Sequence, residues 1–201
     1  MIVAAFDFDG TITKNDSFIR FIIKTKGVLR FIIGFTLLAP VILLYLLKII
    51  PNWKAKSMVF SYFFRKESLD SFNGYCEEFA YSIEGNTKEP AMNRIDYHRS
   101  KGHEIVILSA SIENWIRPWA VKNQIDKVIG TKIELDDKQY LTGKFLTKNC
   151  YGQEKVNRLL EVFPERDSYT LYAYGDSKGD RELIEFADFG FLNKFENENQ
   201  E

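Results

Sequence analysis

The chain has 201 residues, of which 45% are hydrophobic and 27% are charged, and its formal net charge is -1. This length suits one domain, or one domain with an insertion, and the composition is that of a folded globular protein. The small net charge argues against a general nucleic-acid binder, which normally carries a surplus of Lys and Arg. The two cysteines, Cys76 and Cys150, have no metal-binding spacing, so we expect reduced, buried thiols in a cytosolic protein. His98 and His103 are expected on the surface, without a role.

The first predicted element is a strand over Ile2–Phe6, a short and continuous apolar run. Such a run fits a strand that is buried on both faces, as in a parallel sheet. No basic leader precedes it, so we expect no signal peptide. Two acids, Asp7 and Asp9, follow the strand directly. Carboxylates held this close repel each other, so the pair needs a chemical explanation.

Residues 14–85 have the pattern of helices only. Asp16 or Ser17 can cap the first helix. A later helix carries apolar residues at helical spacing, namely Leu69, Phe72, Cys76, Phe79 and Ile83. We therefore predict an all-helical cap domain over 14–85, inserted after the first strand.

From residue 86 onward, strands and helices alternate. Strands are predicted at Glu104–Leu108, Val128–Ile129, Tyr169–Tyr174 and Phe189–Leu192, helices over 112–119, 154–163 and 180–187, and a short hairpin over 136–145. This alternation indicates a mainly parallel sheet with helices on both faces. The predicted fold class is α/β, with a doubly wound, Rossmann-like catalytic core formed by residues 1–13 and 86–201.

Polar clusters fall where these strands end or the next helix begins: DFDGT (7–11), SAS (109–111), Lys155 and GDSKGD (175–180). Ligands of doubly wound sheets bind at this edge. Asp7 and Asp176 are expected to converge there, and clustered carboxylates with open water positions suit Mg²⁺. Ser109 and Lys155 can then hold the oxygens of a phosphate group. The predicted phosphate site also includes the backbone N–H groups of Phe8, Asp9 and Ala110.

This set of motifs resembles that of the haloacid dehalogenase superfamily of phosphohydrolases. DFDGT matches the first family motif, ILSAS the second, GQEK the third around Lys155, and GDSKGD the fourth. The resemblance implies that Asp7 is the nucleophile, which forms an aspartyl-phosphate. It implies that Asp9 is the general acid and then the base, and gives its backbone carbonyl to Mg²⁺. It also implies that Asp176 is a metal ligand, with supporting roles for Gly10, Thr11, Ser177 and Asp180.

Asp9 must hold a proton near neutral pH to act as an acid, whereas an unperturbed Asp has a pKa of about 3.9. We expect the charges of Asp7 and of a bound phosphate to raise the pKa of Asp9. Asp7 would then act as the nucleophile and Asp9 as the proton carrier, which explains why the two acids occur as a pair.

The position of the insertion resembles the helical-cap branch of the superfamily (subfamily IB) that includes phosphoserine phosphatase. Residues 31–47 carry no charge, and this apolar cap more loosely resembles relatives of phosphatidylglycerophosphatase C. A single membrane crossing would separate Asp7 from Asp176, so we do not expect one. Two alternatives remain open: short helices, broken at Gly34 and Pro40, that pack within the cap, or a shallow hairpin by which residues 28–50 touch a membrane. Basic residues flank the run, namely Lys24, Lys26, Arg30, Lys48, Lys54 and Lys56.

The predicted function is that of a Mg²⁺-dependent phosphomonoester hydrolase (a phosphatase) acting through an aspartyl-phosphate on a small phosphorylated metabolite. A membrane lipid phosphate as substrate and a phosphotransferase reaction remain alternatives. A signalling receiver is disfavoured because Asp9 gives the hydrolytic water a base, and a noncatalytic scaffold has no need of the complete acid set. We expect a cytoplasmic protein, with peripheral contact to the inner membrane face as an option, and no nucleic-acid partner.

Overall fold

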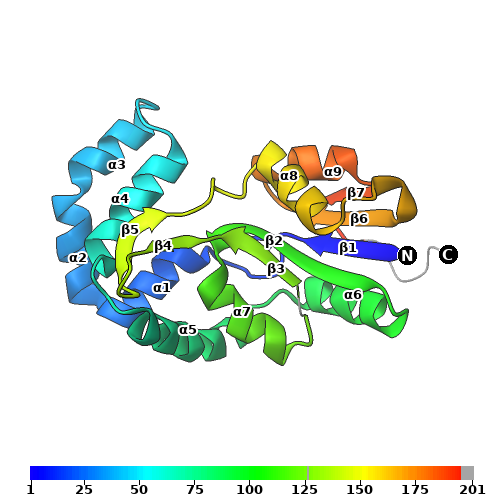
Figure 1. Ribbon diagram of the computed structural model, residues 1–201, viewed down its shortest axis with the longest axis horizontal. Helices are drawn as coiled ribbons and strands as arrows, with labels where there is room; N and C mark the ends of the chain where they lie inside the picture. Colours follow the sequence, from blue (N-terminus) through cyan, green and yellow to red (C-terminus); the bar gives the residue numbers. More distant parts are fainter. Residues whose placement is uncertain (126, 196–201) are drawn as a thin grey trace.

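The computed structural model describes residues 1–125 and 127–195, and a five-stranded sheet forms its centre (Figure 1). The strands are β1 (Ile2–Phe6), β2 (Glu104–Ile112), β3 (Lys127–Thr131), β6 (Thr170–Gly175) and β7 (Phe189–Leu192). Their order is β3-β2-β1-β6-β7, and every neighbouring pair is parallel. The predicted α/β class with a mainly parallel sheet is confirmed.

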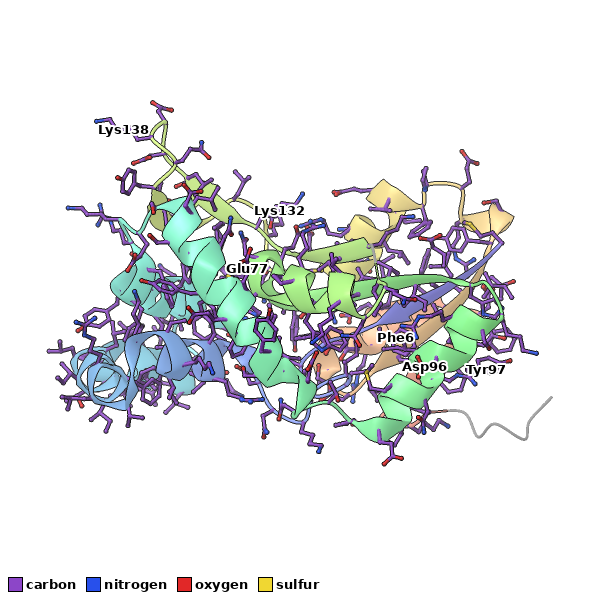
Figure 2. The ribbon with its side chains drawn as sticks, turned by 90° about the horizontal axis from the view of Figure 1, so that it is seen from below. Phe6, Glu77, Asp96, Tyr97, Lys132 and Lys138 are labelled. Atoms are coloured by element: carbon purple, nitrogen blue, oxygen red, sulfur yellow. The ribbon has the colours of Figure 1, made fainter. Side chains whose placement is uncertain are left out.

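Helices cover both faces of the sheet. Val3 and Ala5 of β1 belong to the buried cluster on the side of α8 (Gln153–Val162) and α9 (Arg181–Phe186). Ala4 and Phe6 point the other way, toward α6 (Glu89–Ser100) and α7 (Glu113–Lys122). Figure 2 shows α6 beside the sheet near Phe6, with Asp96 and Tyr97 on this helix. Because both faces are covered, β1 is apolar throughout instead of alternating.

The helical segment between β1 and α6 consists of five helices within residues 14–85. They are α1 (Ser17–Lys26), α2 (Val28–Leu37), α3 (Ala39–Leu46), α4 (Asn52–Phe64) and α5 (Leu69–Glu84). Asp16 caps α1, since its carboxylate accepts the backbone N–H of Phe18 at 2.9 Å. We call these five helices the cap, and its boundaries as a separate domain stay a prediction.

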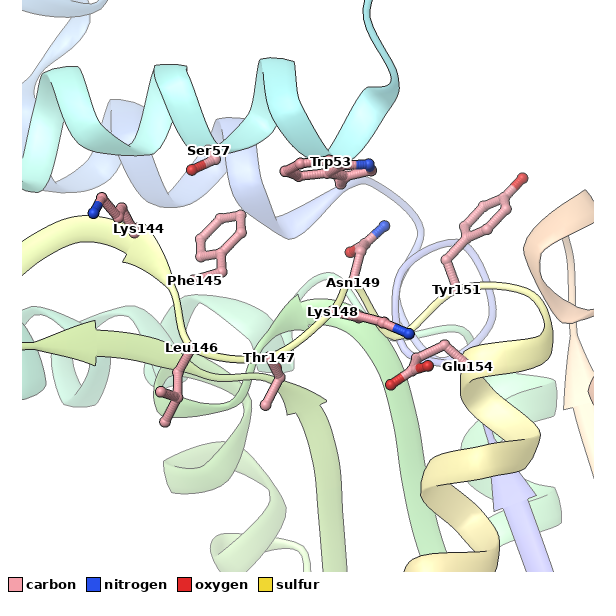
Figure 3. Close-up of a pocket in the computed structure, with 10 residues that line it drawn as sticks. All are labelled: Trp53, Ser57, Lys144, Phe145, Leu146, Thr147, Lys148, Asn149, Tyr151 and Glu154. Atoms are coloured by element: carbon pink, nitrogen blue, oxygen red, sulfur yellow. The ribbon is translucent and has the colours of Figure 1, made fainter.

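A hairpin of the second core segment extends to the cap. It consists of β4 (Ile133–Leu135) and β5 (Leu141–Phe145), and Lys138 lies at its tip (Figure 2). The backbone N–H of Leu141 donates to the carbonyl of Glu67 at 2.9 Å, in the turn between α4 and α5. Figure 3 shows α4 above the chain that leaves β5, with Trp53 and Ser57 on the facing side of the helix. The hairpin is therefore a second connection between core and cap.

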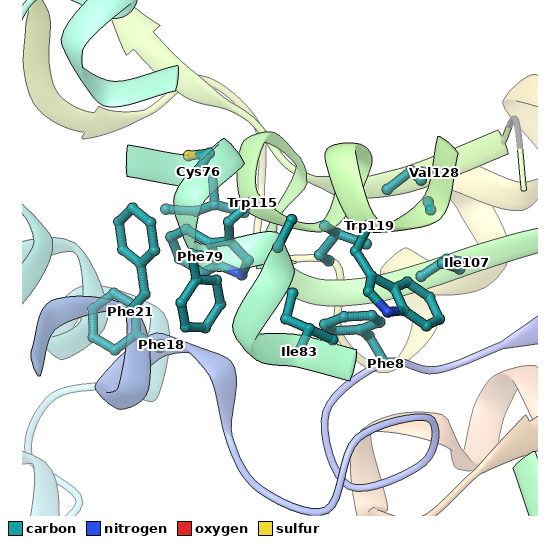
Figure 4. Close-up of a cluster of buried hydrophobic side chains, with 14 of the residues drawn as sticks. Phe8, Phe18, Phe21, Cys76, Phe79, Ile83, Ile107, Trp115, Trp119 and Val128 are labelled. Carbon is teal, nitrogen blue, oxygen red and sulfur yellow. The ribbon is translucent and has the colours of Figure 1, made fainter. Parts of the chain in front are cut away.

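Aromatic side chains fasten the cap to α7 of the core (Figure 4). The ring of Phe21 in α1 stacks on Trp115 at a centroid distance of 4.7 Å and meets Phe79 of α5 edge-on at 5.3 Å. Each such pair contributes about 0.5–1.5 kcal/mol beyond the burial of its surface. Cys76 lies in the same cluster, and Cys76 and Cys150 are both buried and free, as predicted.

His98 does not lie on the surface, so that expectation is wrong. Its side chain is fully buried, and Nε2 lies 2.9 Å from the Tyr174 hydroxyl of β6. Nδ1 lies 2.7 Å from Nδ1 of His103. Burial lowers the pKa of His98 to about 3, with the charge of Arg94 acting in the same direction. The imidazole is thus a neutral hydrogen-bonding group beneath the sheet.

Candidate active site

Asp7 lies at the carboxyl end of β1, where the sheet meets the cap. The ladder continues through it, because its backbone N–H donates to the carbonyl of Tyr174 at 2.9 Å. Its side chain is buried, and Oδ1 accepts a hydrogen bond from Lys155 Nζ at 2.6 Å. Burial raises the pKa of Asp7 to about 7, although the positive charge of Lys155 opposes the shift. Asp7 is therefore a carboxylate whose ionisation depends on the cation next to it.

Lys155 joins two of the predicted site residues. It lies in the first turn of α8 and is only 2% exposed. Nζ donates to Asp7 and also to Asp180 Oδ1, the latter at 2.5 Å. Burial lowers the pKa of Lys155, but the two carboxylates outweigh it and the pKa is raised. The ammonium group is thus held charged and in place.

Three carboxylates form an acidic cluster beside this lysine. Asp7, Asp176 and Asp180 each offer an oxygen, and these oxygens lie within 4.8 Å of one another. Burial raises the pKa of Asp176, while the hydroxyl of Thr11, which donates to it at 3.1 Å, opposes the shift. Such a set of hard oxygen donors fits a divalent cation of the Mg²⁺ type. The carboxylate set contains Asp180, whose role was expected to be only supporting.

Asp180 owes its position to a tight turn after β6. Its Oδ2 accepts the backbone N–H groups of Asp176 and Ser177 at 3.2 and 3.0 Å and the Ser177 hydroxyl at 2.8 Å. These bonds and Lys155 lower the pKa of Asp180 although burial acts against them. Asp180 is thus an ionised group that holds both the turn and the lysine.

Gly10 allows the loop after β1 to pass close to this turn. Its φ is +82°, and a Cβ atom there would lie 2.2 Å from Asp176 Oδ2. Both the backbone conformation and the close approach therefore require glycine.

Asp9 lies on the cap side of the site and is held by two serines. Ser17 donates its backbone N–H to Oδ1 at 2.8 Å and its hydroxyl to Oδ2 at 3.0 Å, and the Ser111 hydroxyl also donates to Oδ2. Burial is the main cause that raises the pKa of Asp9, followed by the charge of Asp16. The sequence predicts that the charges of Asp7 and of a bound phosphate raise this pKa, whereas in the protein alone burial and Asp16 do so. Ser17 and Ser111 were not predicted as site residues.

The other predicted phosphate-binding residues differ in whether their side chains face the cavity. Ser109 is buried near the end of β2, and its hydroxyl accepts the backbone N–H of Ser111 at 3.0 Å. Ser109 and Ala110 line the same cavity as Asp7 and Asp9. The ring of Phe8 points away, since it packs edge-on against Trp119 at 5.5 Å. Only the backbone of Phe8 is thus placed to face a ligand.

The acids open into a cavity of about 480 Å³ between core and cap. The cap contributes its apolar wall, which includes Phe18, Ile19, Phe35, Ile42, Tyr45 and Val59. A second cavity, of about 630 Å³, adjoins it through Asn149 and Tyr151 (Figure 3). The second cavity contains none of the clustered aspartates. The first cavity is therefore the candidate active site.

Lys56 reaches this cavity from α4. Nζ donates to the carbonyl of Ala110 at 3.1 Å and lies 5.1 Å from the centre of the Phe18 ring. Burial lowers its pKa, against the charge of Asp9. The sequence places Lys56 and Lys26 among the basic residues that flank the apolar run, but Lys56 lies in the site and Lys26 pairs with Glu67 at 2.5 Å. The sequence alone carries no signal that separates Lys56 from its basic neighbours.

Comparisons with known proteins agree with this arrangement. A model of the haloacid dehalogenase-like hydrolase family matches residues 4–185. Protein CicA from Caulobacter vibrioides is 32% identical over 188 residues, which cover 93% of this chain and 83% of CicA.

Among the solved structures that share the fold are one from Bordetella pertussis and one from Francisella tularensis. A protein with unknown function from Bordetella pertussis has a TM-score of 0.80 at 19% identity, covering 92% of this chain and 86% of its own. A phosphoserine phosphohydrolase-like protein from Francisella tularensis has a TM-score of 0.66 at 14% identity, covering 96% of this chain and 86% of its own.

Proposed function

Because the chain belongs to the haloacid dehalogenase-like hydrolase family, we propose that it is a Mg²⁺-dependent phosphomonoester hydrolase acting through an aspartyl-phosphate on Asp7. One observation carries the proposal: a buried carboxylate at the end of β1 is bound to Lys155 and lies in a cluster of three acids. A buried nucleophile, a fixed cation and a metal-type donor set are what phosphoryl transfer requires.

In the first step, Asp7 attacks the phosphorus atom and the bond to the leaving oxygen breaks. Oδ1 of Asp7 accepts from Lys155, which leaves Oδ2 as the attacking oxygen. Asp9 gives its proton to the leaving alcohol. This role fits the direction of its pKa shift, because burial raises the pKa of Asp9 and thereby favours the protonated form.

In the second step, a water molecule attacks the phosphorus atom of the aspartyl-phosphate. Asp9, now ionised, takes a proton from this water, and Asp7 is released together with inorganic phosphate. Ser17 and Ser111 hold the Asp9 carboxylate in both steps, since both donate to it. They act as positioning residues for the proton carrier.

The proposed metal ligands are the Asp7 and Asp176 side chains and the backbone carbonyl of Asp9. When bound, Mg²⁺ lowers the repulsion between Asp7 and the incoming phosphate dianion. Asp180 supports the site by holding Lys155 and the turn that carries Asp176. Thr11 supports it through its hydrogen bond to Asp176.

The proposed phosphate site consists of Lys155, the Ser109 hydroxyl and the backbone N–H groups of Phe8, Asp9 and Ala110. Support comes from the cavity, which Lys155, Ser109 and Ala110 line together with Asp7. Lys155 provides a point charge and the other groups provide directed donors.

The proposed substrate is a small phosphorylated metabolite, handled in the cytoplasm. A lipid phosphomonoester is the second candidate, and a specific observation favours it. Phe35, Ile42 and Tyr45 of the cap line the cavity, so the part of the substrate that faces the cap would meet an apolar wall. Transfer of the phosphate to another alcohol would use the same first step, with the cap selecting the acceptor.

The function is tested with p-nitrophenyl phosphate as a generic aryl phosphate. We expect hydrolysis in the presence of Mg²⁺, loss of hydrolysis on addition of EDTA, and recovery when excess Mg²⁺ is restored. A rate that EDTA leaves unchanged would contradict the metal assignment. If no hydrolysis is seen under any of these conditions, phosphatase activity toward generic aryl phosphates is contradicted.

Lys56 provides a further prediction, because we propose that it binds an anionic group of the substrate from the cap side. Lys56→Met should raise KM for p-nitrophenyl phosphate by about tenfold or more, the expected cost of a hydrogen bond to a charged group. Lys54→Met is the matched control, since Lys54 lies on the same helix but is exposed. Equal KM values for the two variants would show that Lys56 does not contact the substrate.

A further inference from the structure

The helices α2 and α3 expose apolar side chains that no residue of the described ranges, 1–125 and 127–195, covers. In α2 only Gly34 is buried, and in α3 no residue is. Six apolar residues of this segment are at least 60% exposed, namely Val28, Leu29, Leu37, Leu46, Leu47 and Ile49. The run does form short helices, and Phe31, Phe35 and Leu38 pack inward as one alternative expected, but Leu37, Leu46 and Leu47 do not pack within the cap. A contiguous apolar surface of this kind usually binds a partner.

The two helices form a bent pair at the outer end of the cap (Figure 1). The angle between them is 64°, and Pro40 lies in the first turn of α3. Among residues 1–125 and 127–195, no single helix has the length and apolarity to cross a membrane, and only this bent pair meets the two criteria jointly. Because of this bend, the two helices do not form one straight span. This arrangement favours a position in the plane of a membrane surface.

One side of the pair is fixed to the cap. A Cβ atom on Gly34 would lie 2.4 Å from the ring of Phe63, so α2 and α4 are in close contact there. Both flanking helices are anchored, because Phe21 of α1 and Phe60 of α4 are fully buried. The chain is thus fixed in the protein before and after the bent pair, while Leu37, Leu46 and Leu47 of this segment are exposed.

The charge of this region fits an anionic surface. Residues 17–66 contain nine Lys or Arg residues and no Asp or Glu, although the whole chain has a net charge of -1. Exposed members flank the apolar surface: Lys24, Arg30, Lys48 and Lys54. An apolar surface within a basic surround matches the layers of a bilayer that contains anionic lipids. A symmetric dimer would instead bring two basic regions together, which like-charge repulsion disfavours.

We propose that the outward side of α2 and α3, together with residues 47–50, docks in the headgroup region of a bilayer containing anionic lipids. Phe35, Ile42 and Tyr45 belong to the same segment and line the active-site cavity. Docking therefore places the cavity beside the lipid surface. The consequence that a lipid phosphomonoester reaches Asp7 from the bilayer rests on the proposed function, whereas docking itself does not.

The test is co-sedimentation of the full chain with vesicles of phosphatidylcholine that do or do not contain phosphatidylglycerol, at low salt. We expect the protein to sediment with the mixed vesicles and much less with pure phosphatidylcholine. The double variant Leu46→Glu/Leu47→Glu should bind the mixed vesicles more weakly than the wild type, by about tenfold at least. Val121→Glu is the matched control, because Val121 is 61% exposed on α7 of the core, and it should bind like the wild type.

Charge is tested separately. Lys48→Glu/Lys54→Glu should weaken binding to mixed vesicles by at least about fivefold for each lysine replaced, because each substitution removes a positive charge and adds a negative one. Lys138→Glu, at the tip of the β4–β5 hairpin, should not change it. Hydrolysis of p-nitrophenyl phosphate in solution should be the same for the wild type and the Leu46→Glu/Leu47→Glu variant, which shows that the variant is folded.

Three results would overturn the proposal: no sedimentation with mixed vesicles, equal sedimentation of the leucine variant, or self-association that the leucine variant abolishes while vesicle binding is absent. The last result would assign the surface to a second copy of the chain. Vesicle binding without any phosphatase activity would leave docking in place and contradict the proposed function alone.

Discussion

Asp7→Asn should reduce turnover of p-nitrophenyl phosphate by at least about 10⁴-fold, since removal of a covalent nucleophile costs this much or more. The amide has almost the same shape as the carboxylate, but it cannot form the acyl phosphate. The substitution also removes one negative charge beside Lys155, but Asp180 still pairs with this lysine, so the fold should be kept. Steady-state rates with saturating Mg²⁺ provide the measurement.

Asp70→Asn is the matched control for this variant, because Asp70 is exposed in the first turn of α5. It should retain the wild-type rate. Far-UV circular dichroism and thermal unfolding should show both variants folded. If Asp7→Asn retains a rate within about tenfold of the wild type, Asp7 is not the nucleophile.

Asp9→Asn should lower turnover by about 10²–10⁴-fold, the usual contribution of a positioned proton carrier. An aryl alcohol leaves easily without a proton, so formation of the aspartyl-phosphate should be affected less than its hydrolysis. The phosphorylated enzyme should therefore accumulate, and a rapid-mixing experiment should show a burst of nitrophenol followed by slow turnover.

The Asp9 variant should still bind Mg²⁺, because the proposed contact is the backbone carbonyl. Titration calorimetry with the metal alone measures this independently of turnover. A wild-type rate in Asp9→Asn would remove the acid–base role, and a large loss of metal affinity would show that the side chain itself takes part in the metal site.

Much of the sheet and of the acidic cluster could be predicted, because both depend on short segments. Apolar runs such as Ile2–Phe6 specify buried strands, and parallel order brings their carboxyl ends to one edge. Asp7 and Asp176 directly follow β1 and β6, which are neighbours in the sheet. Their meeting therefore follows from topology and needs no detailed packing.

Other parts of the site depend on contacts between distant residues and could not be predicted. Ser17 starts the first cap helix and Ser111 lies near the end of β2, yet both bind the Asp9 carboxylate. Lys56 approaches Ala110 only because α4 lies above the end of β2. His98 is buried because α6 packs on the face of the sheet that carries Tyr174. The residue types at these positions are also common on protein surfaces. Only the packing of the helices therefore determines whether each side chain is buried or exposed.

The apolar run shows a third situation. Its composition is compatible with a packed helix, a membrane hairpin or a docking surface, and local sequence does not distinguish them. The structure shows that Gly34 and Phe35 turn inward while Leu37 and Leu46 turn outward. The direction of each side chain depends on where α4 lies, which the run itself does not specify.

The central claim is that a phosphoryl group passes through Asp7. Radiolabelled substrate can be mixed with the enzyme and quenched in acid during turnover, and the labelled peptide can then be identified by mass spectrometry. We predict label on Asp7, greater labelling in Asp9→Asn than in the wild type, and none in Asp7→Asn. Label on another residue, or turnover of Asp9→Asn with no labelled protein at any time, would contradict the account.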